Sequence, residues 1–218
     1  IQETGLQMIE VGTTNKTNLN DYTKALKEFP NSIILKVHRS NYSISGFTEE
    51  VSIKELSEIK EYYETFLIHD LGSGLVVDRK FLEINHIDIF NNETSVQNSL
   101  DDGSDLVMFS GDKLFGSVQS GIIAGKSRLI ENIKNYSLFR TYRCSPLTLF
   151  ELQETATSYI NKDELSIPFW HLISQSYQSL EIRIKNIVSE SSFEFEIQEG
   201  TSLIGGGTLP GVTMKSPV

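Results

Sequence analysis

The chain has 218 residues, of which 39% are hydrophobic and 22% charged, a composition typical of soluble proteins with a sizeable core. Its apolar runs have the length of strands and are interrupted by charges, which excludes a membrane-spanning helix. The chain has a net charge of -10, so as a whole it lacks the excess of basic residues that most nucleic-acid-binding proteins show. A single cysteine, Cys144, excludes an internal disulfide, and residues 1–4 lack the features of a signal peptide, so we expect a cytoplasmic protein.

The first predicted helix is followed by a strand that ends in polar residues. Asn18 or Asn20 is suited to cap a helix over residues 22–29. Residues 32–37 are mostly apolar, as in strands covered on both faces. This strand delivers a polar cluster to its carboxyl end: His38, Ser40 and Asn41. On residue type alone, the histidine also fits a structural, hydrogen-bonded role.

A second helix and strand repeat this arrangement. Ser52 caps a predicted helix that extends to about Glu64 and carries apolar residues at helical spacing. Residues 66–69 form the next predicted strand, in which His69 is expected to pack in or under the sheet. Asp70 stands at its end, before a glycine-rich segment. The pattern alone leaves Asp70 as either a functional carboxylate or a turn aspartate.

The third predicted strand leads to a lysine. Residues 91–100 indicate a loop that enters a short helix, and residues 106–109 form a short apolar run, which predicts a buried strand. Ser110, Gly111 and Asp112 break the run, so Lys113 follows the carboxyl end of a strand. Open α/β sheets hold their ligands at this position, and a partly desolvated lysine there is suited to form a Schiff base. A solvated loop lysine is the competing interpretation.

An arginine pair follows the next strand and helix. Residues 121–125 run as a strand from one glycine to another, and residues 126–136 form a short amphipathic helix. Arg140 and Arg143 lie three residues apart, so they face the same way on a helical turn. Two guanidinium groups on one side of a helix are suited to bind a tetrahedral oxyanion. The alternative interpretation is that both arginines form salt bridges at the surface.

The last part of the chain predicts two helices and one strand. Residues 148–160 and 168–188 have helical patterns, and residues 193–197 alternate apolar residues with glutamates, as a strand with one solvated face does. The run that starts at Gly205 lacks the Gly-Lys-Ser/Thr ending of a P-loop, so we interpret it as a loop.

Several of these segments resemble the motifs of one enzyme family, the bacterial selenocysteine synthases or L-seryl-tRNA(Sec) selenium transferases. Residues 110–125, Ser-Gly-Asp-Lys-Leu-Phe-Gly-Ser-Val-Gln-Ser-Gly-Ile-Ile-Ala-Gly, resemble the family's cofactor-lysine segment. Six other blocks match in the same order: Glu10-Val-Gly-Thr-Thr-Asn-Lys-Thr, Asp21-Tyr22, Lys36-Val-His-Arg-Ser-Asn-Tyr, Gly46-Phe-Thr, Asp70-Leu-Gly-Ser-Gly and Gly205-Gly-Gly-Thr-Leu-Pro. Family members are longer at both ends, so we expect a fragment or a truncated homologue.

The resemblance implies the fold of a fold-type I transferase that depends on pyridoxal 5'-phosphate. Residues 1–146 would form most of the large α/β domain, with a mainly parallel sheet and flanking helices. Residues 147–218 would contain connecting helices and part of a small C-terminal α+β domain. The family's glycine-rich phosphate-binding segment precedes the residues matched here.

The resemblance also implies roles for individual residues. Lys113 corresponds to the Schiff-base lysine and proton shuttle, and Asp112 would assist departure of the substrate hydroxyl. Asp70 would keep the pyridine nitrogen of the cofactor protonated. Ser110 would bind the cofactor phosphate. His38 and Asn41 would lie beside the cofactor. No metal ligand set is expected.

The implied reaction converts the seryl group on tRNA(Sec) to selenocysteinyl through an aminoacrylyl intermediate. Arg140 and Arg143 would hold the anionic selenium donor, selenophosphate, and the family assembles as homo-oligomers. The sequence departs from the family pattern in two segments that bear on donor specificity: Leu114-Phe-Gly-Ser-Val-Gln-Ser-Gly after the lysine and Cys144-Ser-Pro after the second arginine. The alternatives are a pyridoxal-phosphate lyase or transferase acting on a free small molecule without tRNA, and a catalytically inactive truncated homologue.

Overall fold

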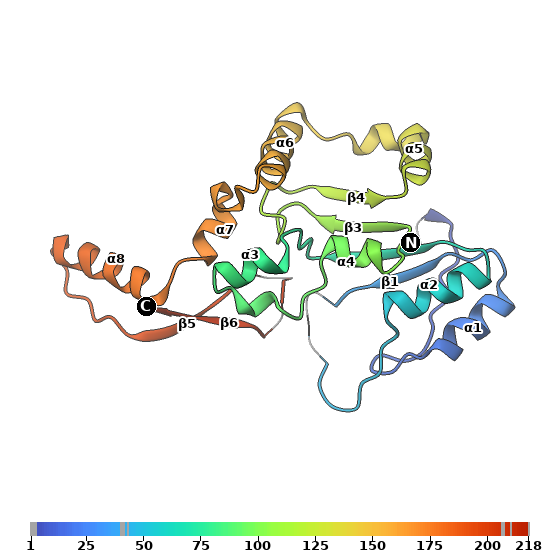
Figure 1. Ribbon diagram of the computed structural model, residues 1–218, viewed down its shortest axis with the longest axis horizontal. Helices are drawn as coiled ribbons and strands as arrows, with labels where there is room; N and C mark the ends of the chain where they lie inside the picture. The colour runs from blue at the N-terminus through green and yellow to red at the C-terminus, as the bar shows by residue number, and fades with distance from the viewer. Residues whose placement is uncertain (1–3, 40–41, 43, 206–207, 210, 218) are drawn as a thin grey trace.

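The computed structural model describes residues 4–39, 42, 44–205, 208–209 and 211–217. Its main sheet has four strands in spatial order: β1 (Ile34–Val37), β2 (Leu67–Gly72), β3 (Leu106–Ser110) and β4 (Gly121–Gly125). The first three strands are parallel, and β4 runs antiparallel to β3 (Figure 1). The expected α/β architecture with a mostly parallel sheet is therefore confirmed.

Capping residues fix where the first two helices begin. Asn18 caps α1 (Leu19–Glu28), and its side chain accepts hydrogen bonds from the amides of Asn20 and Asp21. Ser52 caps α2 (Ile53–Tyr62) through the amide of Glu55. Both caps are capping boxes, in which the acidic residue three positions later accepts a hydrogen bond from the cap amide. Of the two candidate caps for α1, the structure confirms Asn18.

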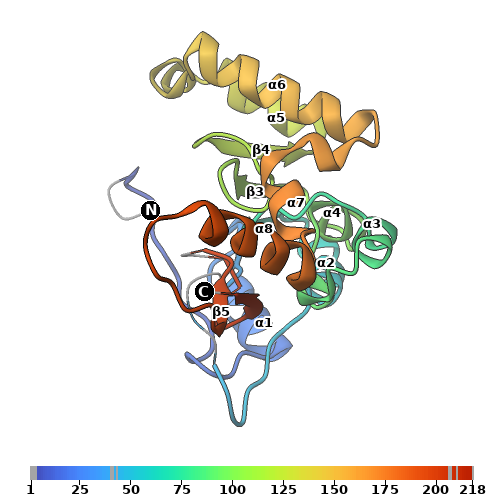
Figure 2. The ribbon, with the colours of Figure 1, turned by 90° about the vertical axis from the view of Figure 1, so that its left-hand side faces the viewer.

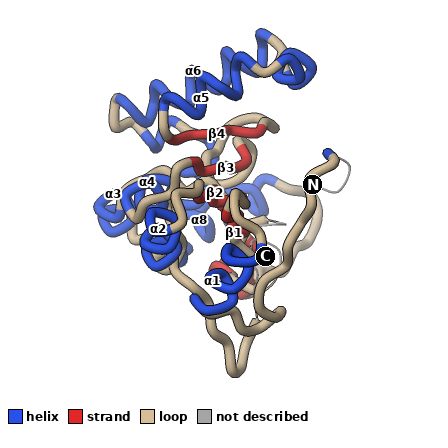
Figure 3. Tube along the Cα trace, turned by 90° about the vertical axis from the view of Figure 1, so that its right-hand side faces the viewer, coloured by secondary structure: helices blue, strands red, loops and turns tan. Residues whose placement is uncertain are grey.

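The helices of the first part of the chain lie on one side of the sheet. Figures 2 and 3 show α2, α3 (Arg79–Ile84) and α4 (Val96–Asp101) on that side, and α1 packs against α2. The alternation in β2 matches this arrangement, because Leu67, His69 and Leu71 are buried while the residues between them are half-buried. On the other face of the sheet, Val37 and Ile123 are exposed.

A buried ion cluster fixes the amino-terminal ends of the strands. Asp105, which is 1% exposed, accepts hydrogen bonds from Leu67 N at 2.7 Å, Lys60 Nζ at 3.1 Å and Lys126 Nζ at 2.6 Å. Burial alone would raise the pKa of this carboxyl, but the hydrogen bonds outweigh burial and hold its pKa below the ordinary value. The cluster therefore links α2, β2, β3 and the start of α5.

Beyond β4, two helices and a 3-10 segment lie along the edge of the sheet farthest from β1 (Figures 1 and 3). These elements are α5 (Ser127–Asn135), η3 (Ser137–Tyr142) and α6 (Pro146–Ile160). The predicted helices 126–136 and 148–160 correspond closely to α5 and α6.

The C-terminal part differs from the prediction in two places. The expected helix over 168–188 is two helices, α7 (Pro168–Ile173) and α8 (Tyr177–Glu190), because Ser176 caps the second through the amide of Ser179. Residues 193–197 are not a strand. The strands are instead β5 (Glu199–Leu203) and β6 (Thr213–Pro217), which pair antiparallel with each other. Alternation alone misplaced the strand because pairing with a neighbour, rather than periodicity, decides which residues form it.

Candidate functional site

The carboxyl ends of β1, β2 and β3 meet at one edge of the sheet. Val37 pairs with Asp70, and Gly72 pairs with Phe109. The backbone amide of His38 donates to the carbonyl of Asp70 at 2.8 Å, which extends the ladder by one residue. The polar residues that follow these three strands are therefore neighbours.

Asp70 and Ser110 lie on the same face of the sheet. Asp70 pairs with Met108, and Ser110 is two residues further along β3, so its side chain returns to that face. Both residues are half-buried. They lie on the face opposite the one covered by α2 and α4. A carboxylate and a hydroxyl are thus presented together at the carboxyl edge.

Lys113 occupies the turn that follows β3. It is half-buried, whereas its neighbour Asp112 is exposed. Among the residues that the structure describes, no ion pair or hydrogen bond is recorded for the Lys113 ammonium or amine group. This side chain is therefore available to a ligand.

Hydrogen bonds from two directions hold the lysine turn, which we define as residues 111–117. Leu114 N donates to Ser73 O at 2.9 Å, which ties the turn to the loop after β2. Tyr159 of α6 donates to Phe115 O at 2.8 Å. The turn also closes on itself, because Ser117 N donates to the carbonyl of Gly111 at 2.8 Å.

Glycine is required where the turn passes closest to its neighbours. A Cβ atom at Gly111 would lie 2.2 Å from Ser120 Oγ and 2.7 Å from Val118 O. At Gly74, where φ is +77°, a Cβ atom would lie 2.6 Å from the Phe109 ring. Both distances are shorter than any ordinary Cβ contact, so neither position has room for a larger residue.

His38 faces a buried carboxylate that the sequence analysis did not identify. Its Nε2 lies 3.5 Å from Glu93 Oε1, and the Ser73 hydroxyl donates to the same oxygen. Glu93 and Ser73 are 8% and 1% exposed. The polar run around Glu93 has no periodicity, so only the tertiary structure reveals this contact.

The other predicted site residues are not joined to this cluster. Arg140 lies in η3 and Arg143 directly after it, and both are exposed on the segment between α5 and α6. Within the described part of the chain, no ion pair or hydrogen bond is recorded for either guanidinium group. Asn41 and Ser40 lie outside the described residues.

The edge therefore combines an amine, carboxylates, a hydroxyl and an imidazole at the ends of adjacent parallel strands. An amine in this position is suited to covalent binding of a carbonyl compound, and a nearby carboxylate is suited to a protonated ring nitrogen. In the part of the chain that the structure describes, no helix is long and apolar enough to span a bilayer.

Comparisons with known proteins identify the family of this chain. The family model for L-seryl-tRNA selenium transferase matches residues 1–218. The L-seryl-tRNA(Sec) selenium transferase of Campylobacter fetus subsp. fetus (strain 82-40) is 38% identical over 216 residues, which are 99% of this chain and 47% of that protein. The enzyme of the same name from Clostridium botulinum (strain Loch Maree / Type A3) is 40% identical over 213 residues, covering 94% of this chain and 44% of that protein.

A solved structure shows a similar fold. The structure of D-glucosaminate-6-phosphate ammonia-lyase superposes with a TM-score of 0.58 at 16% sequence identity, covering 91% of this chain and 45% of that one. The chain thus spans less than half the length of the curated relatives that it matches. Because the family model matches the whole sequence, the chain belongs to the L-seryl-tRNA selenium transferase family.

Proposed function

We propose that the protein containing this chain converts seryl-tRNA(Sec) to selenocysteinyl-tRNA(Sec) with pyridoxal 5'-phosphate as cofactor and selenophosphate as donor. The observation that carries the proposal is Lys113, half-buried in a turn just past β3, at the same edge of the sheet as Asp70 and Ser110. The family relationship supports the same reaction. The fold-type I assignment, a domain boundary between residues 146 and 147, assembly as a homo-oligomer and a cytoplasmic location belong to the same proposal.

The residues at the strand ends fit the proposed cofactor. Lys113 Nζ would bind the aldehyde carbon, the Asp70 carboxylate would keep the pyridine nitrogen protonated, and the Ser110 hydroxyl would donate to the phosphate. When bound, pyridoxal phosphate supplies an electron sink for loss of a proton from the substrate Cα. Asn41 completes the proposed cofactor set, and His38 lies beside it at the end of β1.

The same residues would move the protons of the reaction. Once the substrate amine has displaced it, the Lys113 amine would accept the proton from Cα and later return one. Asp112 is exposed beside it and would assist departure of the substrate hydroxyl. These two roles require only the lysine turn, whose position the hydrogen bonds to Ser73 and Tyr159 fix.

Arg140 and Arg143 would bind the donor anion. Both are exposed, and guanidinium groups bind tetrahedral oxyanions through charge-assisted hydrogen bonds. Since η3 lies along the β4 edge, the donor would approach the lysine turn from the side of α5 and α6 (Figure 1). The strongly acidic chain has no basic footprint of its own, so we assign tRNA contacts to other parts of the longer protein.

The test is formation of selenocysteinyl-tRNA by the full-length protein from seryl-tRNA and selenophosphate. We expect Lys113→Ala to abolish the product. Arg140→Ala and Arg143→Ala should each raise the KM for selenophosphate by about tenfold or more, because each removes a charge-assisted hydrogen bond. Arg128→Ala removes an exposed arginine from α5 and is the matched control. It should change neither product formation nor the KM for selenophosphate. The proposal would be contradicted if the protein converted a free amino acid but did not convert seryl-tRNA.

A further inference from the structure

Glu93 is a buried carboxylate that connects two of the loops at the carboxyl edge. It precedes α4 and reaches the loop after β2 through Ser73 and the end of β1 through His38. Only 4% of its side chain is exposed, compared with 27% for His38. The proposed reaction, as described above, assigns Glu93 no role.

The backbone around Glu93 is fixed on both sides. Its amide donates to Phe90 O at 2.9 Å, and Phe90 is a core residue that is 1% exposed. Three residues later, Val96 N donates to Leu75 O at 2.8 Å. The segment that carries Glu93 is therefore held alongside residues 73–75, and the carboxylate has little freedom to leave its partners.

The partners of the carboxylate lead directly to the proposed cofactor residues. A buried carboxylate is stable only when it is paired, and the Ser73 hydroxyl and the His38 imidazole are the groups placed against it. Ser73 also accepts the hydrogen bond from Leu114 N, next to Lys113, through its carbonyl. His38 N is bonded to the carbonyl of Asp70. Glu93 thus contacts two residues whose backbones are hydrogen-bonded to Asp70 and to Leu114, the neighbour of Lys113.

We infer that Glu93 is a positioning residue for the reaction: it holds the His38 ring with Nε2 toward its own carboxylate and, through Ser73, keeps the lysine turn in place. The contact at 3.5 Å places Nε2 beside the carboxylate and so limits rotation of the ring. Glu93 itself is too buried to reach a substrate. This inference rests on the proposed function for its catalytic consequence but not for the contact itself.

The contact can be measured without cofactor or substrate. The full-length protein without added cofactor is treated with diethyl pyrocarbonate, and the labelling of each histidine is followed by mass spectrometry. Glu93→Gln keeps the size of the side chain and an acceptor for Ser73 but replaces the carboxylate beside His38 Nε2 with a neutral amide. We expect His38 to react about threefold faster or more, because an unrestrained ring exposes both nitrogens. His86 and His171, both exposed, serve as internal references and should be unchanged.

Ser73→Ala is the second variant, because it keeps the charge and removes only the hydroxyl. We expect a smaller increase in His38 labelling in the same direction. The matched control is Glu83→Gln, which removes an exposed carboxylate from α3 and should leave His38 labelling at the wild-type rate. Equal labelling of His38 in the wild type, Glu93→Gln and Ser73→Ala would overturn the inference.

The effect on catalysis is measured by determining kcat and KM separately for the variant and the wild type. Glu93→Gln should lower kcat about tenfold with the KM for seryl-tRNA changed less than about twofold, since a misplaced group affects the chemical step more than binding. Unchanged kcat in a variant whose His38 labelling has risen would contradict a positioning role. Failure of the proposed function is distinguishable, because the wild type would then give no product while the labelling still reports the contact.

Discussion

At the scale of single residues, His69 shows how the sheet dictates the chemistry of a side chain. It lies on the covered face of β2 and is 2% exposed. Its Nδ1 contacts Ser99 Oγ at 2.7 Å, whereas its Nε2 is the one buried side-chain nitrogen or oxygen atom without a hydrogen-bond partner among the described residues. Burial first, and then the charges of Lys36 and His38, lower the pKa of His69 from 6.5 to about 4.

This shift predicts a loss of stability in weak acid. Because the pKa is lower in the folded protein than in the unfolded chain, unfolding takes up a proton between pH 6.5 and about 4. The free energy of unfolding therefore has its full value, as far as His69 determines it, above pH 6.5. It falls by up to about 3 kcal/mol as the pH decreases through this window. Urea unfolding of the 218-residue chain at several pH values, monitored by the fluorescence of Trp170, measures the change.

The control for this prediction is His69→Asn, which keeps a polar group near Ser99 but does not titrate. Between pH 6.5 and 4 the wild type should lose more stability than the variant, and the difference isolates His69 from the carboxylates that titrate nearby. Parallel curves for the two proteins would show that His69 is not the group responsible.

The position of a single residue was predictable from the sequence only where the neighbouring residues indicate it. Lys113, Asp70 and Ser110 follow apolar runs, which predicted that they lie at or just past strand ends. The structure confirms this for Ser110, the last residue of β3, and for Lys113 in the turn after it, whereas Asp70 lies within β2, two residues before its end at Gly72. Burial of His69 was also predicted. Glu93 and Ser73 were not, because a buried pair twenty positions apart leaves no local pattern. The catalytic and binding roles themselves remain predictions.

At the scale of secondary-structure elements, α6 and α7 together hold the lysine turn. Tyr159 of α6 accepts a hydrogen bond from Trp170 Nε1 of α7 and donates to Phe115 O, both at 2.8 Å. Trp170 is completely buried. Burial raises the pKa of Tyr159, so its hydroxyl keeps the proton that it donates. The position of the turn therefore depends on Tyr159, which lies 44 residues after Phe115 in the sequence, and on the helix that follows it.

Removing this hydroxyl should loosen the turn. Tyr159→Phe leaves Trp170 Nε1 and Phe115 O without their partner, so we expect the free energy of unfolding to fall by about 2 kcal/mol. Amide exchange at Gly116 and Ser117 should become faster as well, which mass spectrometry of deuterated peptides detects. Tyr136→Phe is the control, because that side chain is 63% exposed. Equal exchange in Tyr159→Phe and the wild type would contradict a role for α6 in fixing the turn.

Helices and strands were predictable where capping residues or apolar runs mark them in the sequence. They were not predictable where pairing with a distant strand decides which residues form the element. The candidate caps, Asn18 or Asn20 for α1 and Ser52 for α2, predicted where these helices begin, and the apolar runs predicted the three parallel strands. The expected strand over 193–197 failed because Phe193 and Phe195 find no partner strand and are 74% and 59% exposed. The division of the predicted helix over 168–188 at Ser176 was missed because a polar residue within an apolar stripe also fits an unbroken helix.

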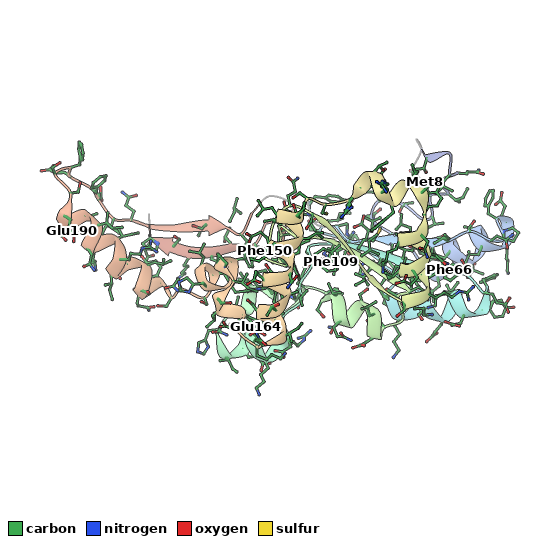
Figure 4. The ribbon with its side chains drawn as sticks, turned by 90° about the horizontal axis from the view of Figure 1, so that it is seen from above. Met8, Phe66, Phe109, Phe150, Glu164 and Glu190 are labelled. Carbon is green, nitrogen blue, oxygen red and sulfur yellow. The ribbon has the colours of Figure 1, made fainter. Side chains whose placement is uncertain are left out.

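At the scale of the whole molecule, the chain is elongated and exposes much apolar surface. Figure 4 shows Glu190, at the end of α8, at the opposite end from Phe66, which precedes β2. The accessible surface is 14800 Å², whereas a compact monomer of 24.6 kDa would expose about 10,000 Å². Leu147 and Phe150 of α6 are among the exposed apolar side chains. We expect such surfaces to be covered by further protein, as exposed apolar patches usually are.

The central claim, that Lys113 binds pyridoxal phosphate at the carboxyl edge of the sheet, has one direct test. The full-length protein and its Lys113→Ala variant are mixed with pyridoxal phosphate, and their visible absorption spectra are compared after removal of unbound cofactor. The account predicts the absorption band of lysine-bound cofactor in the wild type and none in the variant. A band of equal strength in Lys113→Ala, or no band in the wild type, would contradict it.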